Sequence, residues 1–221
     1  LYAAVGAVGA GPGDEVICSP YTMIASATAA IAFNAVPVFA DIDPDTYCIS
    51  AATIAPRITP RTKAIIVVHI FGQAADMDPI MALAERHGLR VIEDAAEVHG
   101  AEYKGRKCGT LGHVSAWSFY ANKIINTGEG GMVVTSDPQI AARARSYRNL
   151  CFVPERRFFH EGLGYNFRMT NLQAALGVAQ MERIEEFVAI KRRLGEVYRT
   201  ALAGLPLNCQ VERPWAKCVY W

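Results

Sequence analysis

Residues 63–70 have the sequence KAIIVVHI, a continuous run of mostly apolar, β-branched side chains. A strand with one solvent-facing side alternates polar and apolar residues, whereas a strand covered on both faces is apolar throughout. The run therefore predicts a central strand of a parallel sheet. Other short strands alternate with helical segments, which is typical of an α/β domain with a largely parallel sheet. The predicted strands span residues 14–17, 36–40, 89–94, 114–119 and 131–135, and the predicted helices span 22–33, 50–57, 78–88, 137–148 and a long segment from 170.

Local signals define several of these helices. Residues 22–33 are apolar nearly all round, which predicts a buried helix. Asp78, which precedes a proline, is expected to cap a helix. Thr170 and Gln173 form a capping box at the start of the long helix, along which an apolar stripe continues through residues 172–184.

The composition argues against several classes of protein. Of the 221 residues, 52% are hydrophobic and 19% are charged, so a large core is expected. The formal net charge of +1 argues against a nucleic-acid-binding surface, and no apolar run is long enough to span a membrane. The six cysteines include no C-x-x-C pair and no zinc-ligand spacing. We therefore expect free thiols, no metal site and a reducing compartment, the cytoplasm.

A lysine and an acid indicate a specific chemistry. Lys123 lies in a loop followed directly by the glycine-rich segment 127–131. A lysine in such a loop is able to form a Schiff base with an aldehyde. Asp94 ends the predicted strand 89–94, at the edge of the sheet where ligands gather in parallel folds. An acid there is able to hold a pyridine nitrogen in its protonated form. Together the two are the minimal protein groups for pyridoxal 5'-phosphate chemistry.

Six segments, in order along the chain, resemble the motifs of one enzyme family. They are GPGDEVI at 11–17, PVFADI at 37–42, VHIFGQ at 68–73, EDAAE at 93–97, SFYANK through TGEGG at 118–131, and GYNFRMT at 164–170. Together they resemble the DegT-type sugar aminotransferases. This resemblance implies a three-layer type I aminotransferase large domain with a mostly parallel central sheet, and pyridoxal 5'-phosphate as the cofactor.

The resemblance also implies roles for four polar residues. Lys123 would form the Schiff base with the cofactor and later move a proton to and from the substrate carbon. Asp94 would pair with the protonated ring nitrogen. Ser118 would donate a hydrogen bond to the cofactor phosphate. Asn166 would reach the phosphate of the cofactor in a neighbouring subunit.

Three further positions are weaker candidates. Glu97 replaces the Gln that many relatives carry near the ring hydroxyl of the cofactor, and a carboxylate beside that oxygen is expected to have a raised pKa. Met23 occupies a position where relatives often place an aromatic residue on the cofactor ring, and a thioether is also able to pack there. His160 is expected to face the sugar substrate.

Family members are nearly twice as long as this chain. The resemblance implies that residues 1–185 form a pyridoxal phosphate-binding large domain with a truncated beginning. Residues 186–221 would then contain a connecting helix and the beginning of a small C-terminal domain, which is also truncated. A homodimer with shared active sites is implied as well.

The reaction implied by the resemblance is transfer of an amino group from L-glutamate to a keto group of a nucleotide-linked deoxysugar. Residues 159–171 are most similar to perosamine synthases, which aminate a 4-keto-6-deoxy sugar. Two alternatives remain open. Pyridoxal-dependent sugar dehydratases share the fold, but they replace the lysine with histidine, and Lys123 argues against that activity. A catalytically silent fragment of the same fold is the other alternative.

Overall fold

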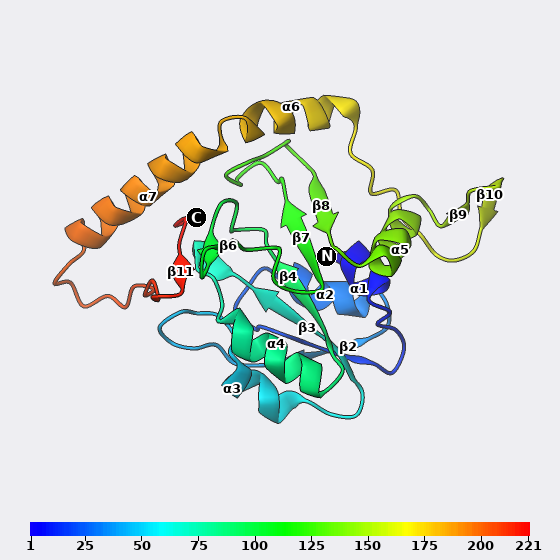
Figure 1. The fold of residues 1–221 in the computed structure, drawn as a ribbon, viewed down its shortest axis with the longest axis horizontal. Coiled ribbons are helices and arrows are strands. Elements are labelled where there is room, and N and C mark those ends of the chain that lie inside the picture. Colours follow the sequence, from blue (N-terminus) through cyan, green and yellow to red (C-terminus); the bar gives the residue numbers. More distant parts are fainter.

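The computed structural model describes residues 1–221, except for the side chain of Arg157. Six strands form its central sheet in the order β2-β1-β3-β4-β7-β8 (Figure 1). Neighbouring strands run parallel except β8, which is antiparallel to β7. The predicted α/β class with a mostly parallel sheet is confirmed. The strands are β1 (Glu15–Cys18), β2 (Val36–Phe39), β3 (Thr62–Val68), β4 (Arg90–Asp94), β7 (Val114–Ser118) and β8 (Gly131–Val134).

The centre of the sheet is buried, as the sequence predicts. Residues 64–68 of β3 are all buried, because both faces of this strand are covered. β4 lies beside β3 in a register that pairs Val68 with Asp94. The two strands therefore end at the same edge of the sheet, and the loops that follow them lie together.

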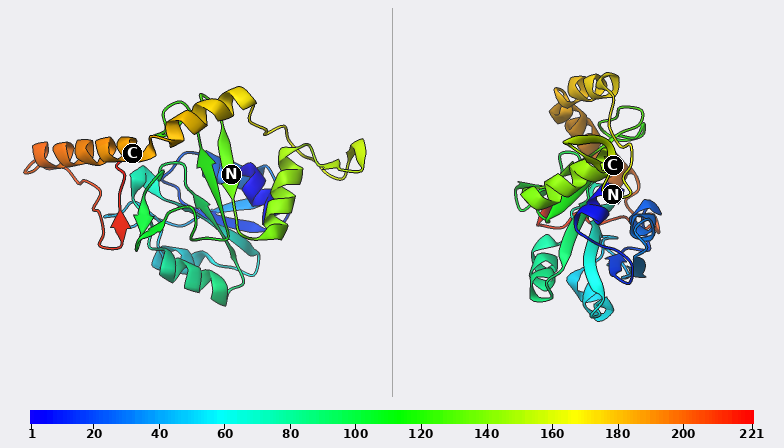
Figure 2. Two further views of the ribbon diagram at one scale, coloured as in Figure 1. Left: turned by 45° about the horizontal axis from the view of Figure 1, so that its top comes forward. Right: turned by 90° about the vertical axis from the view of Figure 1, so that its right-hand side faces the viewer.

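Helices cover both faces and give the domain its three layers. α1 packs against α2 and α5, and α4 packs against α3 and β4. In the right-hand view of Figure 2, the blue helix α2 and the teal helix α4 lie on opposite sides of the sheet. These helices are α1 (Tyr2–Ala7), α2 (Ala25–Ile31), α3 (Ala51–Ile54) with the 3-10 turn η1 (Ala55–Arg57), α4 (Met77–Arg86) and α5 (Pro138–Arg148).

Two helix predictions were wrong in detail. The predicted buried helix at 22–33 is the shorter α2, which buries one face only and leaves Ile31 55% exposed. The N-cap of α4 is Asp76, so Asp78 lies within the first turn instead of at the cap. A negative charge in the first turn still interacts favourably with the helix dipole.

The long helix predicted from residue 170 is divided into α6 (Asn171–Met181) and α7 (Ile184–Ala201). The predicted capping box of Thr170 is present. α6 has no buried residue, and both helices run along the outside of the body, at the top of Figure 1. The proposed domain boundary between residues 185 and 186 falls in the first turn of α7, and the division into domains stays a prediction.

Smaller elements extend the body at two places. A three-stranded sheet in the order β11-β5-β6 joins the segment before residue 218 to the body. A hairpin of β9 and β10 projects beside α5 (Figure 1). The strands are β5 (Glu102–Tyr103), β6 (Arg106–Lys107), β9 (Phe152–Val153), β10 (Arg156–His160) and β11 (Ala216–Lys217), and the 3-10 turn η2 (Ile70–Gly72) follows β3.

The six cysteines are all free, as the sequence predicts. Among the described residues, no helix combines the length and the apolar character that crossing a membrane requires.

Candidate active site

Asp94 is a buried carboxylate at the end of β4, in the centre of the sheet. Its side-chain oxygens accept hydrogen bonds from Ser26 Oγ at 3.1 Å and from the Ala96 N–H at 3.2 Å. The residue is only 6% exposed, and no described Lys, Arg or His side chain lies within ion-pair distance of it. A buried carboxylate is costly unless a cation compensates it. Asp94 is therefore suited to receive a positively charged group of a ligand.

The neighbouring Glu93 fixes this end of β4 from the opposite face of the sheet. One carboxylate oxygen accepts N–H hydrogen bonds from Leu111 and Gly112, both at 2.6 Å, and the other accepts one from Gly109 at 2.7 Å. Burial opposes ionisation of Glu93, but hydrogen bonds from His69 and from these N–H groups outweigh it. The pKa of Glu93 therefore lies below its ordinary value, and the residue is held as a carboxylate.

His69 completes this buried network. Its Nδ1 accepts the N–H of Ala75 at 3.1 Å, so the proton is assigned to Nε2, which lies 2.9 Å from Glu93. The pair ties the loop after β3 to the end of β4. Since side chains alternate along a strand, fixing Glu93 also fixes the direction of Asp94. We infer a positioning role for Glu93 and His69, a role that the motif EDAAE alone did not reveal.

Lys123 lies in the loop that joins β7 to β8. Its Nζ lies 3.5 Å from Glu97 Oε1 and 3.8 Å from the ring centre of Trp221. Its side chain is 11% exposed. Two backbone hydrogen bonds of Phe119 close the base of the loop. Its N–H donates to the Gly130 carbonyl, and its carbonyl accepts the N–H of Thr127. The amine is thus sheltered between a carboxylate and an aromatic face.

Glu97 faces this amine. Its Oε2 accepts the N–H of Phe71 at 2.7 Å, while its Oε1 faces Lys123. Burial raises the pKa of Glu97 above its ordinary value, and Asp94 raises it further, whereas Phe71 and Lys123 act in the opposite direction. The predicted rise therefore has burial as its main cause within this chain. Glu97 also connects the Asp94 and Lys123 parts of the site.

Ser118 and Met23 lie near the same edge of the sheet. Asp94 is paired with Ala116 in the register of β4 and β7. Ser118 comes two residues after Ala116, so its side chain points to the same face as Asp94. Its Oγ accepts the N–H of Tyr120 at 3.3 Å, which leaves its own proton available for another group. Met23, which lies just before α2, is 72% exposed.

The other two predicted residues lie elsewhere in this chain. Asn166 is in the segment that leads to α6, and its Oδ1 accepts a hydrogen bond from Arg168 at 3.0 Å. His160 is on β10, in the projecting hairpin, with Nδ1 2.7 Å from the carbonyl oxygen of Leu150. Their roles at a site shared between subunits stay predictions.

Two aromatic residues beside Lys123 were missed by sequence reasoning. Trp221 covers the amine, and the buried His99 packs edge-on against Trp117 with ring centres 5.1 Å apart. Burial, assisted by the charge of Lys123, lowers the pKa of His99 to about 4. His99 follows the EDAAE motif by two residues but lies outside it, and no sequence signal connected residue 221 to Lys123.

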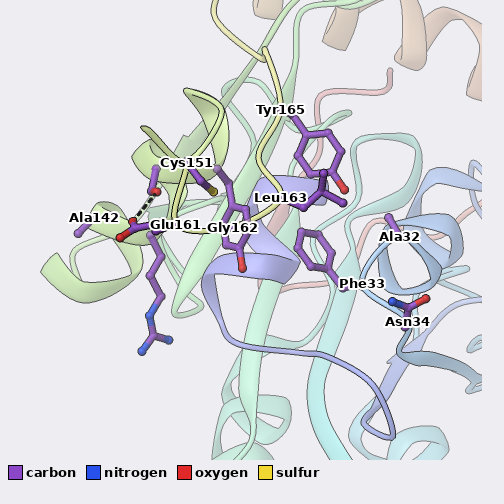
Figure 3. Close-up of a pocket in the computed structure, with 12 residues that line it drawn as sticks. Ala32, Phe33, Asn34, Ala142, Cys151, Glu161, Gly162, Leu163 and Tyr165 are labelled. Atoms are coloured by element: carbon purple, nitrogen blue, oxygen red, sulfur yellow. Dashed lines mark hydrogen bonds between the residues drawn. The ribbon is translucent and has the colours of Figure 1, made fainter. Parts of the chain in front are cut away.

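A separate cavity of about 560 Å³ lies between α5, the end of α2 and residues 161–165 (Figure 3). Its polar groups include Arg143 and the Glu161 carboxylate, which accepts a hydrogen bond from Ser146 at 3.3 Å. Neither Lys123 nor Asp94 lines it. The size of this cavity therefore does not identify it as the reactive site, because the reactive groups converge elsewhere.

Known proteins resemble the whole chain. The model of the DegT/DnrJ/EryC1/StrS aminotransferase family matches residues 1–221. A GDP-perosamine synthase of Caulobacter vibrioides is 50% identical over 205 residues, covering 93% of this chain and 55% of that protein. A GDP-perosamine synthase of Vibrio cholerae is 42% identical, covering 100% of this chain and 60% of that protein.

Solved structures agree with this similarity. An aminotransferase from Psychrobacter cryohalolentis has a TM-score of 0.90 at 39% identity, covering 99% of this chain and 60% of that one. S. venezuelae DesV, solved with a ketimine intermediate, has a TM-score of 0.91 at 39% identity, covering 99% of this chain and 59% of that one. This chain therefore spans little more than half the length of these proteins.

Proposed function

This chain belongs to the DegT/DnrJ/EryC1/StrS aminotransferase family, and we propose that the whole protein moves an amino group from L-glutamate to a keto group of a nucleotide-linked deoxysugar. The similarity to GDP-perosamine synthases of three organisms supports a sugar of the 4-keto-6-deoxy type on GDP. The observation that carries the proposal is the sheltered amine of Lys123 at the sheet edge where the buried Asp94 carboxylate has no Lys, Arg or His side chain within ion-pair distance among the described residues.

The enzymes of this family depend on pyridoxal 5'-phosphate, and the residues present fit that cofactor. Its protonated ring nitrogen would supply an ion-pair partner for the Asp94 carboxylate. Lys123 would supply the primary amine, and Ser118 Oγ has a proton available for a phosphate oxygen. When bound, the cofactor supplies an aldehyde for the amine and a ring that withdraws electrons from the reacting carbon.

The chain's own residues would hold the reactants and move the proton. Lys123 would act first as the nucleophile and then as the acid and base at the substrate carbon. Asp94, held by its hydrogen bonds, would keep the ring nitrogen protonated. Glu97 would keep the Lys123 amine in place between these steps. Met23 would pack on the cofactor ring, while Asn166 and His160 would act from a second subunit or on the sugar.

We also propose a homodimer. The outer helix α6 exposes four large apolar residues, an arrangement that marks an interaction surface in a folded protein. Those residues are Leu172, Leu176, Val178 and Met181. A second copy covering α6 would remove them from water and could bring Asn166, which lies just before this helix, to the neighbouring site. The six free cysteines support a reducing location such as the cytoplasm.

A spectral titration of the full-length protein tests the proposed function. Adding pyridoxal 5'-phosphate should produce a visible absorption band of the bound cofactor, and L-glutamate should bleach it. Lys123→Ala should abolish the band, and Lys104→Ala, which removes a surface amine paired with Asp78, should leave it unchanged. A band that no amino donor bleaches would contradict the aminotransferase assignment.

A further inference from the structure

A buried indole N–H lies next to the reactive amine without a hydrogen-bond partner. Trp221 Nε1 is inaccessible to water and has no acceptor among the described residues. The ring centre of the same residue lies 3.8 Å from Lys123 Nζ, so the indole N–H is close to the amine. Buried donors without a partner are rare in folded proteins, and they often mark a place where a ligand supplies the acceptor.

The backbone holds Trp221 in this place. The Phe71 peptide group donates its N–H to Glu97 Oε2 at 2.7 Å, and the Phe71 carbonyl accepts the N–H of Trp221 at 3.2 Å. One residue therefore anchors both groups that flank the Lys123 amine. Phe71 has φ 55°, in the left-handed region that non-glycine residues rarely adopt. Such backbone strain persists where the surrounding structure requires it.

The neighbouring glycine makes the approach of this segment possible. Gly72 accepts the N–H of Val219 at 3.3 Å. A Cβ added at Gly72 would lie 2.8 Å from the backbone nitrogen of Tyr220 and 3.1 Å from that of Trp221. A side chain at residue 72 would thus push the 219–221 segment away from η2. The loop after β3 therefore determines the position of Trp221.

We propose that Trp221 is a further residue of the active site. Its ring restrains and covers the Lys123 amine, and its indole N–H donates a hydrogen bond to an oxygen atom of the substrate that lies beside that amine. The second part rests on the proposed aminotransferase function. The acceptor is a carboxylate oxygen of the amino donor or an oxygen of the keto sugar, and either oxygen is able to accept a hydrogen bond from a neutral N–H donor.

Cofactor-free, full-length protein tests the first part. Trace acetylation followed by peptide mapping gives the labelling of Lys123 relative to the exposed Lys104. Trp221→Leu removes the ring and should raise this ratio by roughly threefold to tenfold, because the aromatic face no longer holds the ammonium group. Trp221→Phe keeps a ring and should change it by less than about twofold. An unchanged ratio in Trp221→Leu overturns the proposed cover.

The cofactor-loaded protein tests the second part in two separate half-reactions. Trp221→Phe removes the indole N–H and keeps a smaller aromatic ring, and it should raise the KM of one half-reaction by about fivefold to tenfold with a smaller change in kcat. An effect with L-glutamate alone assigns the acceptor to the amino donor. An effect with a GDP-linked 4-keto-6-deoxyhexose assigns it to the sugar. Unchanged KM values in both half-reactions overturn the hydrogen bond.

Trp215→Phe is the matched control. Trp215 lies in the same segment, and its Nε1 already donates to the Ala74 carbonyl at 3.4 Å. This variant should leave both KM values and the labelling of Lys123 unchanged. If the wild-type protein fails to capture pyridoxal 5'-phosphate, the proposed function is wrong, whereas the labelling experiment still decides whether Trp221 covers the amine.

Discussion

His99 should make the protein lose stability in mild acid. Its imidazole is buried beside the rings of Trp117 and Phe119. Its pKa is lowered from 6.5 to about 4, first by burial and then by the charge of Lys123. Between these two pH values the unfolded chain binds a proton that the folded chain does not bind. Stability therefore falls as the pH falls through this window.

The magnitude follows from the size of this difference. Each pH unit is equivalent to about 1.4 kcal/mol, so His99 should cost about 3 kcal/mol of unfolding free energy by pH 4, most of it between pH 6.5 and 4.5. His99→Phe removes the titrating group and keeps a ring against Trp117. The variant should lack this part of the acid destabilisation.

Urea unfolding of cofactor-free wild-type and His99→Phe protein at pH 7 and pH 4.5 measures the effect. Carboxylates such as Glu93 titrate in both proteins, so their contribution cancels in the comparison. The wild type should lose about 2 to 3 kcal/mol more than the variant over this range. Equal losses would show that His99 is not held neutral by its surroundings, and the reasoning would be refuted.

Three other substitutions test local contacts that hold the fold. Glu93→Gln should destabilise the protein by about 3–5 kcal/mol in urea unfolding, because four donors would lose a buried carboxylate. A loss below about 1 kcal/mol would contradict the positioning role of Glu93. Gly109→Ala should lower Tm more than Gly105→Ala. Both glycines have positive φ, but only a Cβ at residue 109 would lie 2.2 Å from the Trp117 ring. Equal shifts in Tm would show a backbone effect alone. Thr170→Ala should cost about 1 kcal/mol of unfolding free energy through the lost cap, and no change would exclude that role.

The sequence predicted the elements that local chemistry decides. The apolar run at 63–70 forms the buried β3, and Thr170 caps α6 with its side chain. Asp94 lies at the end of β4, and Lys123 lies in the loop after β7, as predicted. These features depend on side-chain periodicity and capping within a few residues, so a single sequence contains the information.

The sequence did not predict features that depend on distant segments. Trp221 contacts Lys123 because the 219–221 segment hydrogen-bonds to Phe71 and Gly72 and packs closely against Gly72. The helix at 22–33 was predicted to be buried because its composition is apolar, but α2 exposes one apolar face. Composition records that a face is apolar, and it does not record whether this chain or another partner covers that face.

Borohydride reduction of the full-length protein with bound pyridoxal 5'-phosphate, followed by peptide mapping, tests the central claim most directly. Reduction fixes the cofactor permanently to the amine that holds it. Label on the peptide that contains Lys123 is the predicted result. Label on a different lysine, or none on a protein that binds the cofactor, would contradict the account.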